Sequence, residues 1–473
     1  MEMSRLLISA AHKSSGKTTL AVGITAALAA RGERVQTYKK GPDYIDPMWL
    51  ARASGRPCFN LDAHLMADAE LQRGFERAAR GATLALVEGN KGLHDGVALD
   101  GSNSNAALAR RLELPVLLVI DTRGITRGIA PLLLGYQAFD RGVRIGGVIL
   151  NRVGGPRHEA KLRAAVGHYT DIPVLGAVPE DAMLAVAERH LGLTPCCEVA
   201  DARERVAAAA AVAAARIDLD AVLALAASAG AAAPAPASEQ ESAPARPDLR
   251  IGIARDRAFG FYYPDDLAAL EAAGAELVPI DTLRDARLPP ALDGLFIGGG
   301  FPEACMDELA ANAALRGALR EAIAGGLPTY AECGGLMYLA RSIHWRGRSA
   351  EMVGAIPGDA VMHERPAGRG YVRLRATAAL PWGGAGETLH GHEFHHSTLE
   401  NLDAGLAYAY EVERGQGIDG RRDGIVLHRL LASYSHLRSG AGSQWAPRFA
   451  AYVRSVRAAQ AAPRPQPELA CAA

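Results

Sequence analysis

The sequence predicts two α/β domains joined by a linker, with a mostly parallel sheet in each domain. The chain has 473 residues, which is more than one hydrophobic core usually organises. Short runs rich in Val, Ile and Leu alternate with helical patterns on both sides of a segment made mainly of Ala, Pro, Ser and Glu. Near-continuous apolar strands separated by helices are typical of parallel sheets that are covered on both faces.

The first domain is expected over residues 1–224. Its strands are predicted by six apolar runs, at 5–10, 33–39, 82–89, 114–121, 144–151 and 172–179. The same rhythm returns in a second domain over residues 249–457, with predicted strands at 250–256, 275–281, 294–300 and 327–333. From about Met352 to Gly424, short strands mix with many glycines, which predicts a more antiparallel region.

The segment between the domains is interpreted as a linker over residues 225–248. It has no large apolar residue after its first position, so it cannot bury a core, and its prolines favour an extended spacer. A similar segment at residues 458–473 is expected to be a disordered tail.

Composition narrows the possible partners and the compartment. The formal net charge is -1, with 51 Lys+Arg against 52 Asp+Glu, which argues against a protein that mainly binds nucleic acid. The opening residues contain no apolar run long enough for a signal sequence or a membrane span. We therefore expect a cytoplasmic protein without a membrane partner. The cysteines show neither metal-ligand nor disulfide-framework spacing, at positions 58, 196, 197, 305, 333 and 471.

A phosphate-binding loop is predicted between the first strand and the first helix. The sequence AHKSSGKTT lies between an apolar strand and a helical run, the context that separates a true ATP-binding loop from a chance match. Backbone amides near Gly16 would hold phosphate oxygens, Lys17 would neutralise their charge, and Thr18, with Thr19 beside it, would lie at the Mg²⁺ of the nucleotide. The first glycine of the usual pattern is Ala11 in this chain.

Carboxylates follow two of the predicted strands. Asp43 and Asp46 come after the second strand, and Glu88 and Asp95 bracket a glycine-rich loop after the third. Ligands gather at the carboxyl ends of parallel strands, and Mg²⁺ bound to a nucleotide takes one or two protein carboxylates. We expect Asp43 and Glu88 to serve as these ligands, although acids at such positions also cap turns and helices.

A nucleophilic cysteine is predicted in the second domain. Cys333 follows an apolar strand, precedes a helical run and is followed by Gly334. A sharp strand-to-helix turn exposes the sulfur, and the helix N-terminus stabilises a thiolate. A buried structural cysteine is the alternative. The loop that contains Gly299 and Gly300 is expected to aim backbone N–H groups, together with that of Gly334, at an oxyanion.

The best candidate for the base that serves Cys333 is His436, which follows another apolar strand. The histidines of GHEFHHS, at 392, 395 and 396, suggest metal binding at first sight. They lack cysteines or further acids at ligand spacing. No orienting carboxylate is apparent, since Arg438 stands where many glutamine amidotransferases have Glu. A Cys–His dyad without a third residue is therefore one interpretation of this site.

Taken in order along the chain, these motifs resemble the cobyrinic acid a,c-diamide synthase family. The resemblance also rests on the motifs KKGPDYIDP, GRGYVRL and SYSHL. It covers nearly all of the chain except the linker and the tail. It implies a first domain similar to dethiobiotin synthetase and a second like class I glutamine amidotransferases. It also implies MgATP-dependent phosphorylation of tetrapyrrole carboxylates, followed by amidation with ammonia from glutamine. By resemblance, Cys333 is the nucleophile and His436 its base; the residues near Mg²⁺ or substrate are Asp43, Tyr44, Ile45, Glu88 and Asp95.

Two departures from the family pattern concern the substrate. Members that act on cobyrinate usually have small residues and an apolar pair where this chain has His12-Lys13 and Asn90-Lys91. Extra cations such as Lys91 suit a macrocycle with a different array of carboxylates. The pattern is similar to relatives that amidate sirohaem or sirohydrochlorin. The alternative is that these lysines are solvated or bind nucleotide.

Two rival classes share parts of this sequence. A ParA/MinD-like nucleotide switch would have the first domain, but it carries a second loop lysine at the position of His12 and lacks a glutaminase half. A non-catalytic binding protein with a degenerate amidotransferase domain is the other rival. Small-molecule substrates are the expected partners, namely a tetrapyrrole, glutamine and ATP, and a homodimer is left open.

Overall fold

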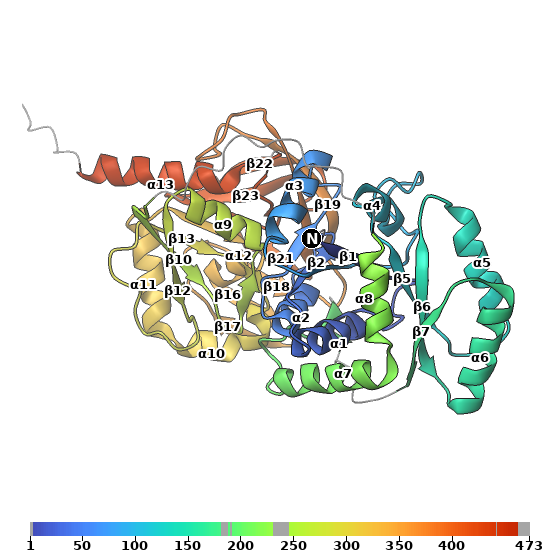
Figure 1. Cartoon of the computed structure of the whole chain (residues 1–473). Helices are drawn as coiled ribbons and strands as arrows, with labels where there is room; N and C mark the ends of the chain where they lie inside the picture. The colour runs from blue at the N-terminus through green and yellow to red at the C-terminus, as the bar shows by residue number, and fades with distance from the viewer. Residues whose placement is uncertain (1–2, 181–187, 190–191, 230–245, 441, 462–473) are drawn as a thin grey trace, which may run out of the picture. The chain divides into compact units, whose positions relative to one another are not determined.

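A computed structural model describes residues 3–180, 188–189, 192–229, 246–440 and 442–461. The chain divides into two compact units, residues 1–240 and 241–473. The division falls inside the segment that we interpret as the linker. Figure 1 shows that helices and strands alternate in both units, so the predicted α/β class is confirmed.

The first unit is built on a parallel sheet of seven strands in the order β3-β2-β4-β1-β5-β6-β7. The N-terminal strand β1 lies at the centre, where it pairs with both β4 and β5. Its strands are buried and rich in Val, Ile and Leu, as expected for a sheet covered on both faces. They are β1 (Ser4–Ala10), β2 (Val35–Lys40), β3 (Phe59–Leu61), β4 (Leu84–Glu88), β5 (Val116–Asp121), β6 (Ile145–Val153) and β7 (Val174–Pro179).

Helices cover both faces of this sheet. One hydrophobic cluster joins the strands to α3 (Asp68–Ala78), α4 (Asn105–Arg111), α5 (Ile129–Phe139) and α6 (Pro156–Tyr169). The opposite face carries helices that contact one another or the strands: α1 (Lys17–Ala30), α2 (Ile45–Ser54), α7 (Ala202–Arg216) and α8 (Leu219–Ala227). Figure 1 shows α8 on one side of β6 and β7 and α5 with α6 on the other. A short antiparallel pair is formed by β8 (Glu188–Arg189) and β9 (Gly192–Leu193).

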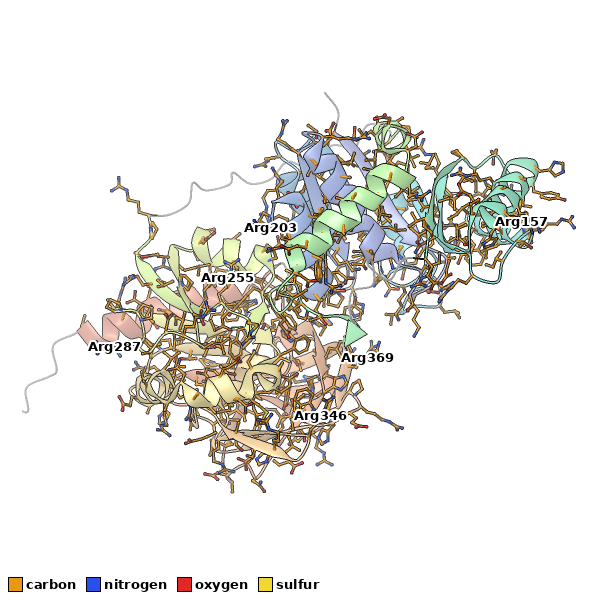
Figure 2. The ribbon with its side chains drawn as sticks, turned by 90° about the horizontal axis from the view of Figure 1, so that it is seen from below. Arg157, Arg203, Arg255, Arg287, Arg346 and Arg369 are labelled. Carbon is orange, nitrogen blue, oxygen red and sulfur yellow. The ribbon has the colours of Figure 1, made fainter. Side chains whose placement is uncertain are left out.

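Charged side chains line the outer helices of the first unit. Figure 2 shows Arg157 on α6 and Arg203 on α7, and both are exposed. On the inner side of α7, the helix packs closely on α1, because an added Cβ at Gly23 would lie 2.6 Å from the carbonyl oxygen of Ala209. Gly23 therefore sets how closely these two helices approach.

The second unit contains a sheet of ten strands in the order β12-β10-β13-β15-β24-β23-β22-β19-β20-β25. The pairs from β12 to β24 are parallel, and those from β24 to β25 are antiparallel. The parallel half comprises β10 (Leu249–Ala254), β12 (Ala275–Ile280), β13 (Gly294–Ile297), β15 (Thr329–Glu332) and β24 (Leu430–Ser433). The antiparallel half comprises β19 (Gly368–Ala376), β20 (Thr388–His395), β22 (Ala407–Arg414), β23 (Arg422–Leu427) and β25 (His436–Leu437). The expected antiparallel region is thus confirmed as an extension of the parallel sheet.

Smaller sheets accompany the large one. A four-stranded sheet has the order β17-β16-β18-β21, and its β16–β18 pair is parallel. Its members are β16 (Ser342–Trp345), β17 (Arg348–Glu351), β18 (Asp359–Met362) and β21 (Ser397–Glu400). A two-stranded antiparallel sheet joins β11 (Phe259–Phe261) and β14 (Gly299–Gly300).

Two hydrophobic clusters organise the helices of the second unit. One cluster includes α9 (Pro264–Ala272) and α13 (Trp445–Ala461). The other includes the 3-10 helix η2 (Pro302–Cys305), α10 (Met306–Ala311), α11 (Ala313–Ala324) and α12 (Gly334–Leu339). Strand residues of the ten-stranded sheet occur in both clusters, such as Ile297 in one and Phe296 in the other. Alternate residues of β13 thus contribute to different cores, as the pleat requires.

Two helices extend beyond the expected domain boundaries. Helix α8 reaches Ala227, inside the segment interpreted as linker, and is capped by the Asp218 side chain, which accepts from the N–H of Ala221 at 2.9 Å. Helix α13 ends at Ala461, so the first part of the expected tail is helical. Alanine is the strongest helix former, which explains both extensions. Residues 462–473 of that tail lie outside the described residues.

Among the described helices, none is long and apolar enough to cross a membrane. The described cysteines are free thiols, at positions 58, 196, 197, 305 and 333.

Candidate active sites

The predicted phosphate-binding loop connects β1 to α1. Gly16 is the N-cap of α1 with φ 81°, a left-handed conformation that favours glycine. The side-chain amide of Asn151 donates to the Ser15 carbonyl at 2.8 Å. An added Cβ at Gly16 would lie 2.3 Å from the same amide nitrogen. Glycine is therefore required at this position by both conformation and space, and Lys17 begins the helix with its side chain buried.

The structure explains why Ala11 is tolerated where the usual pattern has glycine. Ala11 is not among the residues with positive φ, so its Cβ brings no backbone strain. Its N–H donates to Val119 at 3.2 Å, and its carbonyl accepts from the Tyr136 hydroxyl. At the other end of the loop, Arg152 donates to the Ser14 carbonyl at 2.7 Å.

Below this loop, Thr18 lies in a buried cluster of charges. Its hydroxyl donates to Glu88 Oε1 at 2.6 Å and to Asp46 Oδ2 at 3.2 Å. Lys39, from the end of β2, has its Nζ 2.6 Å from Asp46 Oδ2 and 3.0 Å from Glu88 Oε1. The structure thus brings Lys17, Thr18 and Glu88 together as the sequence suggests, and adds Lys39 and Asp46.

Burial and neighbouring charges set the ionisation of this cluster. Burial opposes the charge of Lys39, but Asp46 and Glu88 outweigh it and raise the lysine pKa. Burial lowers the pKa of Lys17, and the nearby charge of Lys39 lowers it further. Burial raises the pKa of Glu88 despite the attraction of Lys39. Two cations therefore share this cluster, as suits a site that binds a polyanionic nucleotide.

Asp43, which we expected at the metal, faces its own helix. Its Oδ1 accepts from the N–H groups of Ile45 at 2.9 Å and Asp46 at 3.1 Å, so it caps the start of α2. Burial, followed by the proximity of Asp46, raises the pKa of Asp43 to about 7. Asp46, and not Asp43, contacts Thr18. The sequence spacing of the two acids did not show which of them would make this contact. Tyr44 is the N-cap residue of α2, and Ile45 is buried.

The loop after β4 is held together by Asn105. Its side chain accepts from the N–H of Asn90 at 3.1 Å and donates to the carbonyl of Gly92 at 2.7 Å. Asp95 accepts from the Gly92 N–H at 2.9 Å, so its carboxylate closes the same loop. Lys91 is exposed, with φ 41°. The loop therefore presents Lys91 on a fixed backbone three residues after Glu88.

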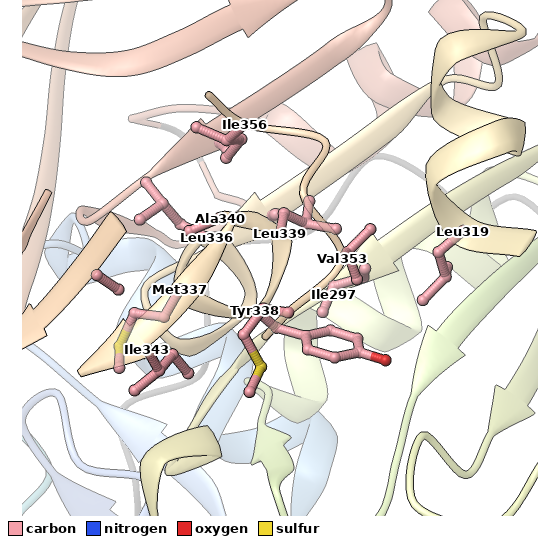
Figure 3. Packing of buried hydrophobic residues seen from close by; sticks show 14 of the residues in the cluster. Ile297, Leu319, Leu336, Met337, Tyr338, Leu339, Ala340, Ile343, Val353 and Ile356 are labelled. Atoms are coloured by element: carbon pink, nitrogen blue, oxygen red, sulfur yellow. The ribbon is translucent and has the colours of Figure 1, made fainter. Parts of the chain in front are cut away.

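In the second unit, Cys333 forms the predicted turn between β15 and α12. Its backbone has φ 47° and ψ -100°, a strained conformation for a residue with a side chain. Figure 3 shows the α12 residues Leu336, Met337 and Leu339 in the hydrophobic cluster that fixes the turn. At Gly335, an added Cβ would lie 2.2 Å from the carbonyl oxygen of Ile297. Close packing thus holds a nucleophile elbow in place.

The loop predicted to stabilise an oxyanion lies against this turn. An added Cβ at Gly334 would lie 2.8 Å from the nitrogen of Gly300, and one at Gly299 would lie 2.7 Å from Cε1 of His436. The N–H of Gly298 donates to the Tyr262 hydroxyl at 3.0 Å. Only residues without side chains fit between the cysteine and the histidine at these points.

His436 occupies β25 and hydrogen-bonds to Cys333 and Glu332. Its Nδ1 lies 3.2 Å from Glu332 Oε2. Burial alone would lower the pKa of His436, but the hydrogen bonds to Cys333 and Glu332 raise it to about 10. The sequence did not reveal this carboxylate, because it precedes the cysteine and does not follow the histidine. The available signal was that Glu332 ends a buried strand directly before Cys333.

The three histidines of GHEFHHS contact neighbouring rings and backbone groups. The ring of His392 stacks on His436 with centroids 4.9 Å apart, as cross-strand neighbours do. His395 stacks on Tyr434 at 3.9 Å, and His396 Nδ1 lies 3.2 Å from a backbone carbonyl oxygen. Within the part of the chain that the structure describes, no group of three or more His, Cys, Asp or Glu side chains is arranged to hold a metal.

Two family descriptions match the two units. Residues 7–193 match the CobQ/CobB/MinD/ParA nucleotide binding domain, and residues 250–443 match the CobB/CobQ-like glutamine amidotransferase domain. Among solved structures, the chain is similar to PurLQS from Thermotoga maritima. The identity is 15% and the TM-score 0.34, over 44% of this chain and 99% of that chain.

Relatives match over nearly the whole length. The chain is 47% identical to the cobyrinate a,c-diamide synthase of Magnetococcus marinus, over 95% of this chain and 97% of that protein. It is 40% identical to the protein of that name from Methanosarcina acetivorans, over 97% of both chains. It is 38% identical to the one from Synechocystis sp., over 94% of this chain and 92% of that protein. The predicted resemblance is confirmed, and the chain belongs to the cobyrinate a,c-diamide synthase family.

Proposed function

We propose that this chain amidates side-chain carboxylates of cobyrinate, with ATP to activate the carboxylate and glutamine to supply ammonia. The observation that carries the proposal is the presence of two complete sites in one chain. One is a phosphate-binding loop above two buried lysines, and the other is a Cys–His pair on a strained turn. Two relatives that match over nearly the whole of this chain are named cobyrinate a,c-diamide synthase.

At the first site, a substrate carboxylate oxygen attacks the γ-phosphorus of ATP, which gives an acyl phosphate and ADP. Ammonia then attacks the acyl carbon, and phosphate leaves as the amide forms. Lys17 stabilises the negative charge of the transferred phosphoryl group, and the loop amides hold the phosphate oxygens. Lys39 keeps Asp46 and Glu88 in place through its ion pairs.

The residues below the loop fit a nucleotide-bound Mg²⁺. Thr18 Oγ1 lies 2.6 Å from Glu88 Oε1, and the other oxygen of Glu88 is buried without a hydrogen-bond partner among the described residues. Mg²⁺ prefers such oxygen ligands together with phosphate oxygens and water. Thr18, Glu88 and Asp46 would hold the ion, which would neutralise phosphate charge. Asp43 would act indirectly by fixing the start of α2.

At the second site, the sulfur of Cys333 attacks the side-chain carbonyl carbon of glutamine. His436 holds the thiol proton as an imidazolium and donates it to the leaving ammonia. The resulting thioester is hydrolysed by water to glutamate. We expect backbone N–H groups around Gly299, Gly300 and Gly334 to stabilise the oxyanion of each step.

The identity of the tetrapyrrole substrate is also part of the proposal. The relatives described above are named for cobyrinate, and they do not specifically support the sirohaem or sirohydrochlorin alternative. We infer a cytoplasmic enzyme, since free thiols persist in a reducing compartment. A homodimer remains a prediction.

Mass spectrometry of the products tests the proposal. The full chain is incubated with MgATP, amide-labelled glutamine and one of three substrates, namely cobyrinate, sirohydrochlorin or sirohaem. We expect labelled amides on cobyrinate only. Labelled amides on a sirohaem-type substrate alone would overturn the assignment of the macrocycle. ATP hydrolysis without any labelled amide would overturn the ligase itself and favour a nucleotide switch.

A further inference from the structure

We propose that Glu332 is the third member of the glutaminase triad and acts as the positioning residue for His436. This inference rests on the glutaminase activity proposed above and deepens it. Glu332 precedes the nucleophile and ends β15, which pairs in parallel with β24 so that Glu332 lies opposite Ser433. The chain then continues from β24 to His436 in β25. The carboxylate and the imidazole are thus brought together by the sheet.

The carboxylate of Glu332 is held in one orientation. It is buried, and its Oε1 accepts from the Tyr330 hydroxyl at 2.6 Å and from the Leu437 N–H at 3.1 Å. These two donors leave Oε2 directed at Nδ1 of His436, 3.2 Å away. A carboxylate fixed by two donors cannot rotate away without losing both, so it fixes the ring of His436 as well.

The position two residues after His436 holds an arginine and not a carboxylate. Arg438 pairs with Asp265 and lies over the Tyr263 ring at 5.4 Å, so it contributes no carboxylate to the histidine. Glu332 lies at the end of the strand before the nucleophile. It therefore takes the place of the Glu that many glutamine amidotransferases have two residues after the histidine. With Nδ1 bound by Glu332, the other ring nitrogen is left for Cys333.

The surroundings identify Glu332 as the anion that stabilises the imidazolium. His436 faces Cys333, Glu332 and the stacked ring of His392. Asp266 is a second buried acid, but it accepts from the Ser439 N–H at 2.6 Å and the Trp445 ring N–H at 3.3 Å. Other titratable groups near the Glu332 carboxylate are the buried phenols of Tyr262, Tyr330 and Tyr410. Those phenols are neutral at physiological pH.

Glu332→Gln tests the inference, because it keeps the shape and removes the charge. We expect the kcat for glutamine hydrolysis to fall by about 10²- to 10⁴-fold, as when a triad carboxylate is replaced by its amide, with little change in KM. The alkaline limb of the pH–rate profile should move to lower pH, because His436 loses the anion that holds its proton. A residue that only supports the fold would not shift this limb. Amidation with ammonium salt should remain, because the first unit is unchanged, and a urea-unfolding curve like that of the wild type shows that the second unit is folded.

Further variants make the test specific. Tyr330→Phe removes one anchor of the carboxylate and should shift the alkaline limb in the same direction by less. Glu413→Gln removes a carboxylate from the same unit, where it pairs with Arg373 at 2.8 Å and Arg375 at 2.5 Å, and should leave the profile unchanged. An alkaline limb at the same pH in Glu332→Gln and wild type overturns the inference, even if the rate falls. Absence of glutamine hydrolysis in the wild type would instead overturn the proposed function.

Discussion

Lys40 is a buried cation at the end of β2. Its Nζ donates to Asn90 Oδ1 at 3.1 Å. Burial lowers its pKa to about 8, and the charges of Lys91 and Lys39 add to this against the opposing effect of Asp62. Lys40 thus contacts the loop that follows Glu88, and Lys91 belongs to that loop. A concentration of positive charge at this place suits a substrate that carries several carboxylates.

The role of Lys91 can be tested by Lys91→Met. If Lys91 pairs with a peripheral carboxylate of the macrocycle, the lost contact is worth roughly 1.5–3 kcal/mol. The corresponding drop in kcat/KM is about 10- to 150-fold, with ATP affinity nearly unchanged. Kinetics with cobyrinate and sirohydrochlorin, with ATP binding measured in parallel, check this. Weaker ATP binding with unchanged substrate preference would assign Lys91 to the nucleotide instead.

His436 makes the stability of the second unit depend on pH. Its pKa in the folded state, about 10, lies above the ordinary value of 6.5. The stabilisation is therefore complete below about pH 6.5 and is lost as the pH rises towards 10. We expect the free energy of unfolding to fall more steeply over this range in wild type than in His436→Gln. The difference should be at least about 1 kcal/mol, because one pKa unit corresponds to ~1.4 kcal/mol. Urea titrations at several pH values measure it, and parallel curves would contradict the expectation.

At the scale of single elements, the turn at Cys333 stores strain. A residue with a side chain costs about 1–3 kcal/mol in such a conformation, whereas glycine adopts it at a smaller entropic cost. Cys333→Gly should therefore be more stable than Cys333→Ala by about 1 kcal/mol, as measured by urea unfolding. Cys305 is the control, because its φ is -118°. At that position the glycine variant should be less stable than the alanine variant. Equal stabilities at Cys333 would argue against strain.

The elements themselves were predictable from the sequence, but some side-chain partners were not. Gly16, Lys17 and Cys333 are identified by local patterns, because a strand, a turn and a helix follow one another along the chain. Glu332 could not be matched to His436 in this way, since that contact depends on the pairing of β15 with β24. For the same reason, the sequence did not show that Asp46 contacts Thr18. Alanine-rich helix ends were mistaken for linker and tail because composition does not distinguish them.

At the scale of the whole molecule, we propose that each unit holds the residues of one reaction. Lys17→Ala should remove amidation with either nitrogen source and leave glutamine hydrolysis, because carboxylate activation is lost. Cys333→Ala should remove activity with glutamine and retain it with ammonium salt. Assays with both nitrogen sources on both variants measure this separation. Equal loss with glutamine and ammonium in Cys333→Ala would contradict the division between the units.

The strand order also determines when each site can form during synthesis. β1 is made before its neighbours in the sheet, β4 and β5, so this central strand has no partner until residues near Glu88 have left the ribosome, and it is paired on both sides only after residues near Val119 have followed. In the second unit, β15 pairs with the earlier strand β13 on one side, but its other neighbour is made much later, since Thr329 of β15 pairs with Leu430 of β24. Cys333 therefore emerges long before the strand and the histidine that enclose it. A nascent chain that stalls before Leu430 carries an unshielded thiol but no glutaminase, so the release of ammonia begins only after β24 and His436 have been made.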